Sequence, residues 1–397
     1  MHGFDSERRA VVVCPVLPYP AVGGGHKRTL RLIEAIARVG GVPQLLTADE
    51  GEPGAVDELR GRGWVVERLQ EGPPSPAARL RQHLARRPSP YLPKLAARLR
   101  ALAPTAAFVQ FEHTQSAYYW DALAGTRSIL SLHNIDSEML ATVARGTPSL
   151  TPAWVRAHNR SLAMRALERR AVPRADAVLC VSAHDRRQLE PRARLVLEAP
   201  NGVDDEFFEI RAELPATEDV LFFGQFDYPP NELGVLRFLR EGWPRLAALR
   251  PRARLLLAGK GMSGELARRA AATERVQPLG FVANLCEVLE RSRLVLVPLW
   301  QGGGTRLKVL EALASARPVV GTPLGVEGIG LEDGRHGLLA DTPAGLADAA
   351  ATSIEDRERS QELARGGREL ADGYRWTRAL SPAERLYDSW LGRARQT

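Results

Sequence analysis

The chain has 397 residues, of which 44% are hydrophobic and 25% are charged, and its formal net charge is +7 at pH 7. This length suits two domains of ordinary size, and the composition excludes collagen-like and low-complexity proteins. No window approaches the roughly 20 apolar residues of a membrane-spanning helix, and the polar first residues show no signal peptide, so we expect a cytoplasmic protein.

The positive charge is concentrated in the first half of the chain. Residues 1–200 contain 28 lysines and arginines against 19 acidic residues, whereas residues 201–397 contain 26 against 28. Most of these cations are arginines, because lysine occurs only at positions 27, 94, 260 and 308. The first half of the chain is therefore predicted to carry the basic surface.

A glycine-rich loop follows the first apolar run. Residues 11–16 are typical of a parallel strand that is buried on both faces, and the loop AVGGGHKRT at residues 21–29 leads into a helical pattern that ends at Gly40 and Gly41. Such a loop brings backbone amides to an anion, although a plain tight turn fits as well. It lacks the Gly-x-x-x-x-Gly-Lys-Ser/Thr spacing of a P-loop, so ATP hydrolysis is not predicted.

Five further strands are predicted in the first half of the chain, separated by helical or irregular stretches. They are Gln44–Thr47, Trp64–Arg68, Ala107–Phe111, Ser128–Leu132 and Ala177–Val181. This alternation favours a doubly wound parallel sheet, whose ligands gather at the carboxyl ends of the strands. His113 and His133 stand at two of these ends. One histidine there is often only a structural residue, but two favour a functional site.

The stretch from Gly72 to Phe111 combines basic and apolar residues and contains no acid. Its seven basic residues are Arg79, Arg81, Arg86, Arg87, Lys94, Arg98 and Arg100. An amphipathic basic segment can lie on an anionic membrane, and it can equally be a solvated helical face. The helical pattern Trp154–Arg170 allows the same two interpretations. Nucleic acid is not predicted as a partner, because no recognition motif is present.

The strand–helix alternation starts again at Val220, after the turn signal at residues 201–204. This restart predicts a second domain. Residues 259–264 match Gly-x-Gly-x-x-Gly, but the acid that a dinucleotide site needs about 20 residues later is missing, so a dehydrogenase is not favoured. The tail Tyr374–Arg395 predicts an amphipathic helix.

The remaining motifs exclude several common chemistries. The chain contains no Gly-x-Ser-x-Gly, no His-Glu-x-x-His and no Asp-x-Asp, which argues against the usual serine hydrolases, zinc proteases and diphosphate-bound metals. Cys14, Cys180 and Cys286 are widely separated and lie in or beside apolar runs. They are predicted to be buried free thiols.

The segment Gln301–Ala314, QGGGTRLKVLEALA, follows the apolar run LVLVPLW and predicts a strand, a tight loop and a helix that begins at about Thr305. The glycine amides and the start of the helix suit an anion, and Arg306 and Lys308 suit phosphate oxygens. Glu311 can accept hydrogen bonds from two neighbouring hydroxyls, as in a ribose. These features together indicate a nucleotide site, although a glycine turn before a buried helix is the simpler alternative.

This segment resembles the nucleotide-sugar motif of retaining glycosyltransferases of family 4, and in particular of the members that contain GGGTRLKVLEA. The resemblance implies an α/β protein of the GT-B type, in which two Rossmann-like domains face each other across a cleft. The expected domains are 1–200 on the acceptor side, 201–373 for the nucleotide sugar, and a helix at 374–397 that packs back on the first domain.

The resemblance also implies roles for individual residues. It implies catalytic roles for His113, Arg306 and Lys308, and places His133 and Asn134 on the acceptor side. The donor-binding residues that it implies are Gly24, Gly25, Gly302, Gly303, Gly304, Thr305 and Glu311. Gly303 stands where many members have a first glutamate. The family's Arg and Lys after the first strand of the second domain are also missing here, so Arg306 and Lys308 are expected to replace them.

The resemblance implies transfer of a sugar, with retention, from a UDP-, GDP- or ADP-sugar to a hydroxyl acceptor, which can be a glycan, a lipid-linked sugar or a small molecule. No cofactor and no metal is expected. Two alternatives stay open: a catalytically inactive nucleotide-binding assembly protein, which the glycine at position 303 favours, and a nucleotide-sugar epimerase, which can share this architecture. The basic first half further predicts peripheral docking on the inner face of an anionic membrane.

Overall fold

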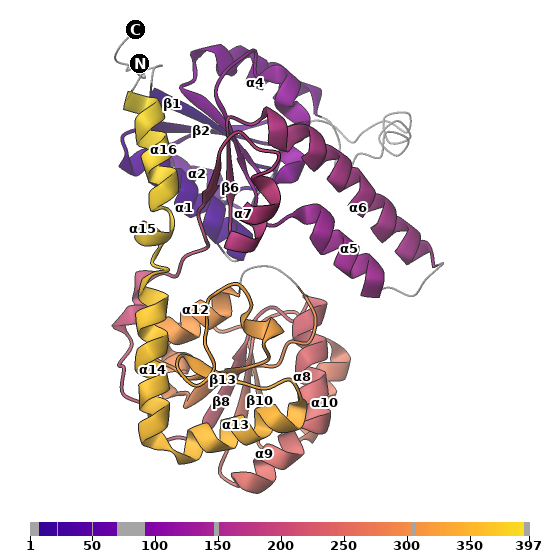
Figure 1. Cartoon of the computed structure of the whole chain (residues 1–397), viewed down its shortest axis with the longest axis vertical. Helices are drawn as coiled ribbons and strands as arrows, with labels where there is room; N and C mark the ends of the chain where they lie inside the picture. The colour runs from indigo at the N-terminus through magenta and orange to yellow at the C-terminus, as the bar shows by residue number, and fades with distance from the viewer. Residues whose placement is uncertain are drawn as a thin grey trace. The chain divides into compact units, whose positions relative to one another are not determined.

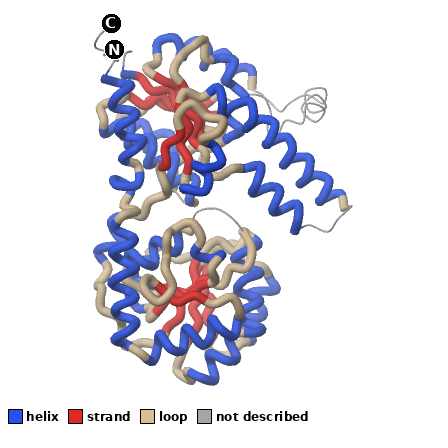
Figure 2. The backbone as a smooth tube through the Cα atoms, in the orientation of Figure 1, coloured by secondary structure: helices blue, strands red, loops and turns tan. Residues whose placement is uncertain are grey.

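The structure is a computed structural model that describes residues 8–21, 23–49, 51–69, 92–146, 151–302 and 306–392. The chain forms two compact units, which are labelled by element in Figure 1. Unit 1 comprises Met1–Asn201 together with Ala379–Thr397, and unit 2 comprises Gly202–Arg378. In both units the strands lie inside and helices cover them, as Figure 2 shows.

Unit 1 is built on a seven-stranded parallel sheet with the order β3-β2-β1-β4-β5-β6-β7. The strands are β1 (Arg9–Val13), β2 (Val42–Thr47), β3 (Val65–Arg68), β4 (Phe108–Glu112), β5 (Ser128–Ser131), β6 (Ala177–Cys180) and β7 (Val196–Glu198). The central strands are apolar because helices cover both faces of the sheet. The strand order reverses between β1 and β4, the position at which ligands bind in open sheets of this kind.

Two of the helices in unit 1 pack mainly against each other. The helices are α1 (Gly24–Arg38), α2 (Ala55–Gly61), α4 (Pro93–Leu102), α5 (Asp136–Gly146), α6 (Pro152–Ala171) and α7 (Ala183–Leu189), and the 3₁₀ helix η3 (Thr114–Ala122) follows β4. Helix α1 buries Leu32, Ile33 and Ile36. Helices α5 and α6 lie side by side and extend away from the sheet (Figure 1).

The C-terminal helix α16 (Ser381–Gly392) belongs to unit 1. Tyr387 is fully buried, and its ring stacks on that of Phe108 with 5.4 Å between the ring centroids. Its hydroxyl donates a hydrogen bond of 2.8 Å to Gln110 Oε1. The tail forms two helices instead of the single helix expected from the sequence, since α15 (Trp376–Ala379) ends before Ser381 and Pro382 start α16.

Unit 2 contains a six-stranded parallel sheet with the order β10-β9-β8-β11-β12-β13. The strands are β8 (Asp219–Phe223), β9 (Arg254–Ala258), β10 (Val276–Gly280), β11 (Leu294–Val297), β12 (Val319–Gly321) and β13 (Gly337–Leu339). The helices are α8 (Pro229–Glu241), α9 (Trp243–Leu249), α10 (Gly264–Ala272), α11 (Leu285–Arg291), α12 (Leu307–Ala314), α13 (Pro343–Glu355) and α14 (Arg357–Asp372). Separate apolar clusters fill the two faces of this sheet.

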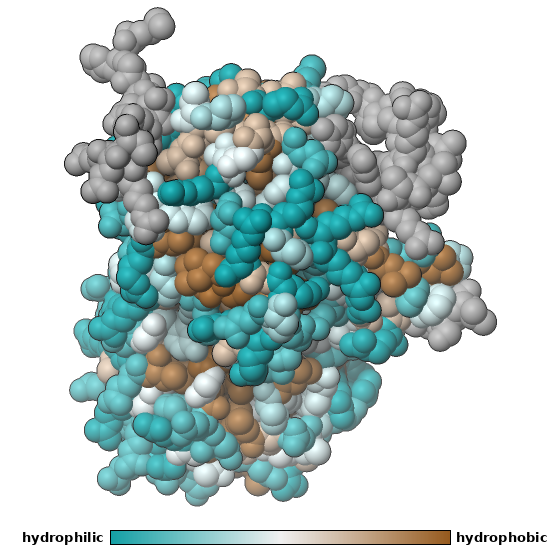
Figure 3. All heavy atoms as spheres, turned by 45° about the horizontal axis from the view of Figure 1, so that its top comes forward, coloured by the Kyte–Doolittle hydropathy of each residue, from teal (hydrophilic) through white to brown (hydrophobic). Residues whose placement is uncertain are grey.

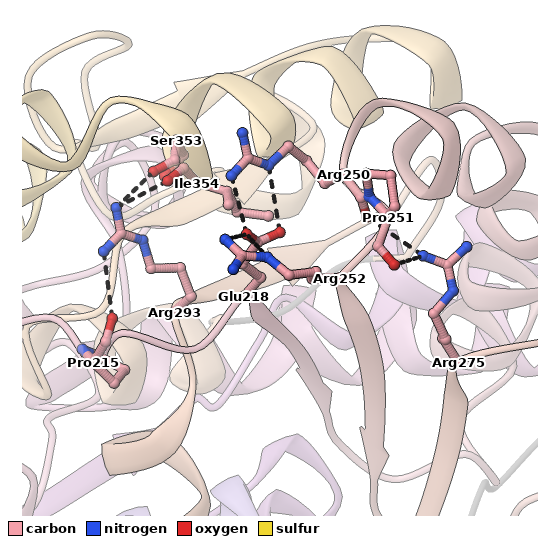
Figure 4. Close-up of polar contacts among 9 residues, drawn as sticks. All are labelled: Pro215, Glu218, Arg250, Pro251, Arg252, Arg275, Arg293, Ser353 and Ile354. Atoms are coloured by element: carbon pink, nitrogen blue, oxygen red, sulfur yellow. Dashed lines mark hydrogen bonds and ion pairs between the residues drawn. The ribbon is translucent and has the colours of Figure 1, made fainter.

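Many arginines of unit 2 stabilise the amino ends of its strands (Figure 4). Arg293, just before β11, donates to the carbonyls of Ser353 and Ile354 at the end of α13, at 3.3 and 3.2 Å. Arg250 and Arg252 both donate to the carboxylate of Glu218, which precedes β8. These side chains satisfy carbonyl groups and a carboxylate near the protein surface, so they explain part of the arginine-rich composition without a ligand.

The described part of the basic segment has a structural role that its composition did not reveal. Residues 70–91, with Arg79, Arg81, Arg86 and Arg87, lie outside the described residues. In α4, Leu95 and Leu99 are buried in the core of unit 1. The Arg98 guanidinium bonds to Glu67 at 2.6 Å, which lowers the pKa of that carboxyl. The apolar face of α4 therefore packs inward and does not face a membrane.

The two Rossmann-like domains expected from the sequence are confirmed by the two parallel sheets with their covering helices. The three cysteines are free thiols; Cys14 and Cys180 are buried and Cys286 is partly buried. None of the described helices combines the length and the apolar character that crossing a membrane requires. Hydrophilic residues dominate the face shown in Figure 3, where apolar residues form separate patches.

Candidate functional site

The start of α1 in unit 1 lies beside two histidines. The first backbone amides of a helix have no intrahelical acceptor, and the N-cap of α1, Gly23, is extended and provides no side-chain cap for them. A Cβ atom added to Gly25 would lie 3.5 Å from His133 Nδ1 and 3.7 Å from His113 Cε1. The absence of a side chain at Gly25 therefore leaves space between the amides and the two imidazoles.

His113 and His133 form a close pair at the carboxyl ends of the neighbouring strands β4 and β5. Their ring centroids are 3.7 Å apart. His113 has a φ of +64°, a backbone conformation that is uncommon for a residue other than glycine. Burial lowers the pKa of His113 to about 3 and also lowers that of His133. Both imidazoles are therefore neutral near pH 7.

Glu112 is a member of this site that the sequence analysis did not identify. It is fully buried at the end of β4, and its Oε2 lies 2.8 Å from Nε2 of His133. An acid at the last position of an otherwise apolar strand, directly before His113, was the available signal. Asn134 is half-buried and follows His133 in the chain.

The second candidate site lies in unit 2, between β11 and α12. Gly302 has a φ of +106°, which favours glycine, whereas Gly303, Gly304 and Thr305 lie outside the described residues. Helix α12 begins at Leu307, two residues later than expected, because Arg306 occupies the N-cap position with a non-helical backbone. The expected order of strand, glycine loop and helix is therefore present with a shorter helix.

Arg306 is almost completely buried, with 5% of its surface exposed. Its Nη2 donates to the carbonyls of Gly302 at 3.1 Å and Leu324 at 3.2 Å. Burial lowers the pKa of this guanidinium. These bonds give Arg306 a role in holding the loop around Gly302, in addition to the charge that it brings to the site.

Lys308 lies on the first turn of α12 and extends to the carboxyl end of β8. Its Nζ donates a 2.6 Å hydrogen bond to Asn231 Oδ1 and lies 4.5 Å from the centroid of the Phe222 ring. A Cβ atom at Gly224, the residue after β8, would be only 2.8 Å from this Nζ. Burial lowers the pKa of Lys308 to about 7.

The Lys308 ammonium lies close to the end of β8, the strand after which the sequence lacks basic residues. Because β8 and β11 are neighbours in the sheet, the ammonium group lies where their carboxyl ends meet. Asn231, which holds this group, was not identified from the sequence. Its own Nδ2 donates to the Gln225 carbonyl at 2.6 Å, which fixes the amide orientation. Glu311 is half-buried and lies three residues after Lys308 on the same helix face.

The two candidate sites differ in their chemistry. In unit 1, backbone amides and neutral imidazoles suit hydroxyl groups, which both donate and accept hydrogen bonds. In unit 2, a guanidinium, an ammonium and a helix start suit an anion. Among the residues that the structure describes, no three His, Cys, Asp or Glu side chains are grouped closely enough to hold a metal ion.

The two Rossmann-like domains, with polar groups collected at the carboxyl ends of their strands, define a two-domain α/β protein of a nucleotide-binding type. Residues 22–207 match the family described as Glycosyltransferase Family 4, and residues 217–356 match the family described as Glycosyl transferases group 1. These matches together include most of the chain. The protein belongs to these glycosyltransferases.

Several solved structures share the fold over nearly the whole chain. Sucrose-phosphate synthase from Thermosynechococcus elongatus is 19% identical, with a TM-score of 0.70 over 97% of this chain and 100% of that one. Anabaena HepE in complex with UDP and glucose is 17% identical, with a TM-score of 0.69 over 96% of this chain and 100% of that one. WaaG, a glycosyltransferase involved in lipopolysaccharide biosynthesis, is 15% identical, with a TM-score of 0.64 over 96% and 100%.

One curated relative is an uncharacterized 44.6 kDa protein in the cps region of Klebsiella pneumoniae. It is 25% identical over 130 residues, which are 31% of this chain. The match spans about a third of the length of that relative, 34%.

Proposed function

We propose that this glycosyltransferase moves a sugar from a nucleoside diphosphate sugar to a hydroxyl acceptor with retention of the anomeric configuration. The observation that carries the proposal is the position of the Lys308 ammonium, beside Arg306 and at the joint carboxyl ends of β8 and β11. Departure of the diphosphate develops negative charge, and fixed cations at this point stabilise it. These cations provide the charge that a metal supplies in other diphosphate sites.

Each residue then has a defined role. Lys308, Arg306 and the loop Gly302–Gly304 with Thr305 bind the diphosphate, and Glu311 accepts hydrogen bonds from the ribose hydroxyls. Gly24 and Gly25 bind the donor through backbone amides, His113 contacts the transferred sugar, and His133 and Asn134 contact the acceptor.

Retention is proposed to occur without a covalent intermediate. A nucleophilic carboxylate must be accessible, whereas Glu112, the acid beside His113, is fully buried and hydrogen-bonded on both oxygens. Same-face attack by the acceptor hydroxyl on the departing sugar is the route that the resemblance implies. HepE has been crystallised with UDP-glucose, which supports a nucleotide sugar as donor here.

The experiment that tests this function is a panel of UDP-, GDP- and ADP-sugars, each offered with sugar and lipid-linked acceptors. We expect nucleoside diphosphate release from one class of donor, an acceptor whose mass increases by one sugar, and an α-linked product from an α-linked donor. Turnover should be unchanged in the presence of EDTA.

The same panel distinguishes the two alternative functions. An assembly protein that has lost catalysis, as the glycine at position 303 suggests, would bind a nucleotide sugar without releasing nucleotide. An epimerase would release nucleotide or change the sugar but leave every acceptor at its original mass. A product with an inverted linkage would contradict the proposed retention of configuration and would leave the proposed sugar transfer intact.

We also propose that this protein is cytoplasmic and docks on the inner face of an anionic membrane through the exposed face of α6. Val155 and Leu162 on this face are 45% and 38% exposed. Because successive residues of an α-helix are rotated by about 100° about its axis, Val155, Leu162 and Ala166 lie in one stripe along α6. Four exposed arginines of α6 lie to either side of this stripe, and they are Arg156, Arg165, Arg169 and Arg170. The fifth, Arg160, lies on the side of α6 that faces Asp136 of α5.

The charge of α6 favours anionic lipid as the partner of this face. The helix contains a single acid, Glu168, which is buried and accepts hydrogen bonds from the Ser137 amide and hydroxyl. The outward charge of α6 is therefore entirely positive. Long arginine side chains can place their cations among lipid headgroups while the apolar stripe between them contacts the acyl region.

Reversing two of these charges should release the protein from vesicles. The wild-type protein is expected to sediment with vesicles that contain anionic lipid at low salt and to dissociate at high salt. Because each basic residue contributes about 1 kcal/mol near the surface, Arg165→Glu with Arg169→Glu should weaken partitioning at least about tenfold. The matched control, Arg187→Glu with Arg192→Glu, changes the same charge on exposed residues outside α6. Equal losses for both pairs would show that only the net charge matters.

A further inference from the structure

The carboxylate of Glu112 is surrounded by hydrogen-bond donors. Gln110 Nε2 donates to Oε1 at 2.5 Å, and the hydroxyls of Thr29 and Ser131 each donate to Oε2 at 3.2 Å. The fourth group is His133, whose Nε2 lies 2.8 Å from Oε2. These groups come from α1, β4 and β5 and meet at a side chain that is completely buried.

The orientation of the Gln110 amide follows from the C-terminal helix. The Tyr387 hydroxyl donates to Gln110 Oε1 at 2.8 Å, so the other end of the amide, Nε2, faces Glu112. Burial raises the pKa of Glu112, whereas His113, the bonds from Gln110 and Ser131, and Arg28 oppose that rise. With a donor at every position, the Glu112 carboxylate acts as an acceptor throughout.

This arrangement determines which nitrogen of His133 carries the hydrogen. A neutral imidazole has one N–H group, and Glu112 requires it at Nε2. Nδ1 then presents a lone pair. Among the described residues, Nδ1 has no hydrogen-bond partner, although His133 is only 7% exposed. The Cβ position of Gly25, at the start of α1, lies 3.5 Å from this nitrogen.

We propose that Glu112 is a positioning residue, which holds His133 in the tautomer whose Nδ1 accepts a hydrogen bond from a substrate hydroxyl at the start of α1. A hydroxyl fits this position because it can donate to Nδ1 and accept from a backbone amide of the helix, whereas a fully ionised phosphate has no hydrogen to donate. The identification of the bound group as a substrate hydroxyl rests on the proposed function. The assignment of the tautomer rests only on the contacts of Glu112 and His133.

The positioning role distinguishes Glu112 from Ser131, its neighbour in the same hydrogen-bond network. Ser131 donates to the same oxygen of Glu112 and, among the described residues, makes no hydrogen bond to His133, so removing its hydroxyl disturbs the buried network and leaves the Glu112–His133 bond in place. A purely structural role for Glu112 would make Glu112 and Ser131 variants differ only in stability. A positioning role makes them differ in the protonation of one ring.

The test uses long-range ¹⁵N–¹H spectra of the full chain with ¹⁵N-labelled histidine. These spectra distinguish the two neutral tautomers, and the signal that disappears in His133→Gln identifies the ring. We expect the wild-type ring to be protonated at Nε2 alone. Ser131→Ala should keep this tautomer, since Glu112 Oε2 remains beside Nε2, whereas Glu112→Met should populate both tautomers. Glu112→Gln should move the hydrogen to Nδ1, because Gln110 Nε2 holds the oxygen of the new amide and leaves its NH2 group beside His133.

Kinetic measurements provide the second readout. In Glu112→Met, kcat should fall at least about tenfold, while KM for the nucleotide sugar changes less than about threefold, because only the orientation of one group has changed. Ser131→Ala should retain kcat within about threefold. If no protein turns over any sugar, the proposed function fails, and the spectra still decide the role of Glu112.

A wild-type ring protonated at Nδ1, or a Glu112→Met spectrum identical to that of the wild type, would overturn the proposal. If Glu112→Met does not fold, the spectra of the wild type and of Glu112→Gln provide the test of the positioning role. Protonation at Nε2 in the wild type and at Nδ1 in Glu112→Gln, with a kcat at least about tenfold lower in the variant, supports the positioning role. Loss of turnover in Glu112→Gln without a change of tautomer refutes it.

Discussion

Replacing Lys308 with alanine should lower kcat about 10²–10³-fold, the usual effect of removing one group that stabilises charge in a transition state. The Lys308 ammonium lies at the carboxyl ends of β8 and β11, where it bonds to Asn231. When the ammonium is lost, Arg306 is the proposed side-chain cation that still stabilises the charge developing on the diphosphate. Steady-state kinetics with the donor found in the sugar panel measure the effect.

Lys94→Ala is the matched control, because it removes the same charge from an exposed position on α4 in unit 1. It should leave kcat within about twofold, as is usual for an exposed side chain away from the chemistry. Thermal unfolding of both variants separates a loss of catalysis from a loss of folding. Small and equal effects of the two substitutions would refute the phosphate role of Lys308.

The catalytic efficiency, kcat/KM, should fall as the pH rises above about 7. Burial lowers the pKa of Lys308 to about 7, so the ammonium is present below that pH and is lost as the pH rises through it. If only the cationic form binds the diphosphate, kcat/KM decreases about tenfold per pH unit above this value. Initial rates at low donor concentration, measured from pH 6 to about 9, report this free-enzyme ionisation.

Lys308→Arg provides the control for this pH dependence, since a guanidinium stays charged over the whole range. The variant should be less active near pH 7, because a planar group fits the Lys308 position poorly, but its profile should lose the decline above pH 7. A decline that persists in Lys308→Arg would assign the ionisation to another group.

The parallel sheets could be predicted wherever strands are buried on both faces. Apolar runs such as Leu294–Trp300 and residues 11–16 read as strands because no polar residue interrupts them. The edge strand β7 has three residues and ends in Glu198, so it lacks this signal. The break between α15 and α16 was missed because the apolar spacing continues across it.

The site could be predicted only where its residues follow strands or glycines directly. His113 and His133 have such positions, and Lys308 lies four residues after the glycines at 302–304. Glu112 and Asn231 do not: the role of Asn231 depends on a lysine 77 residues away, and the role of Glu112 depends on donors from α1, β4 and β5. The ion pair of Arg98 in α4 could not be predicted for the same reason, since Glu67 precedes Arg98 by 31 residues.

The return of α16 to unit 1 has a consequence for the order in which the protein matures. Unit 2 is a continuous stretch, Gly202–Arg378, that is inserted between two parts of unit 1. During synthesis, domains fold as their residues leave the ribosome, so unit 2 can complete its core first. Most of unit 1 is made earlier, but the Phe108 ring and the Oε1 atom of Gln110 can contact Tyr387 only after the C-terminal helix has been made. The hydrogen-bond network that leads from Tyr387 through Gln110 and Glu112 to His133 is therefore complete only after α16 has been made. A nascent chain with a folded unit 2 still lacks this network.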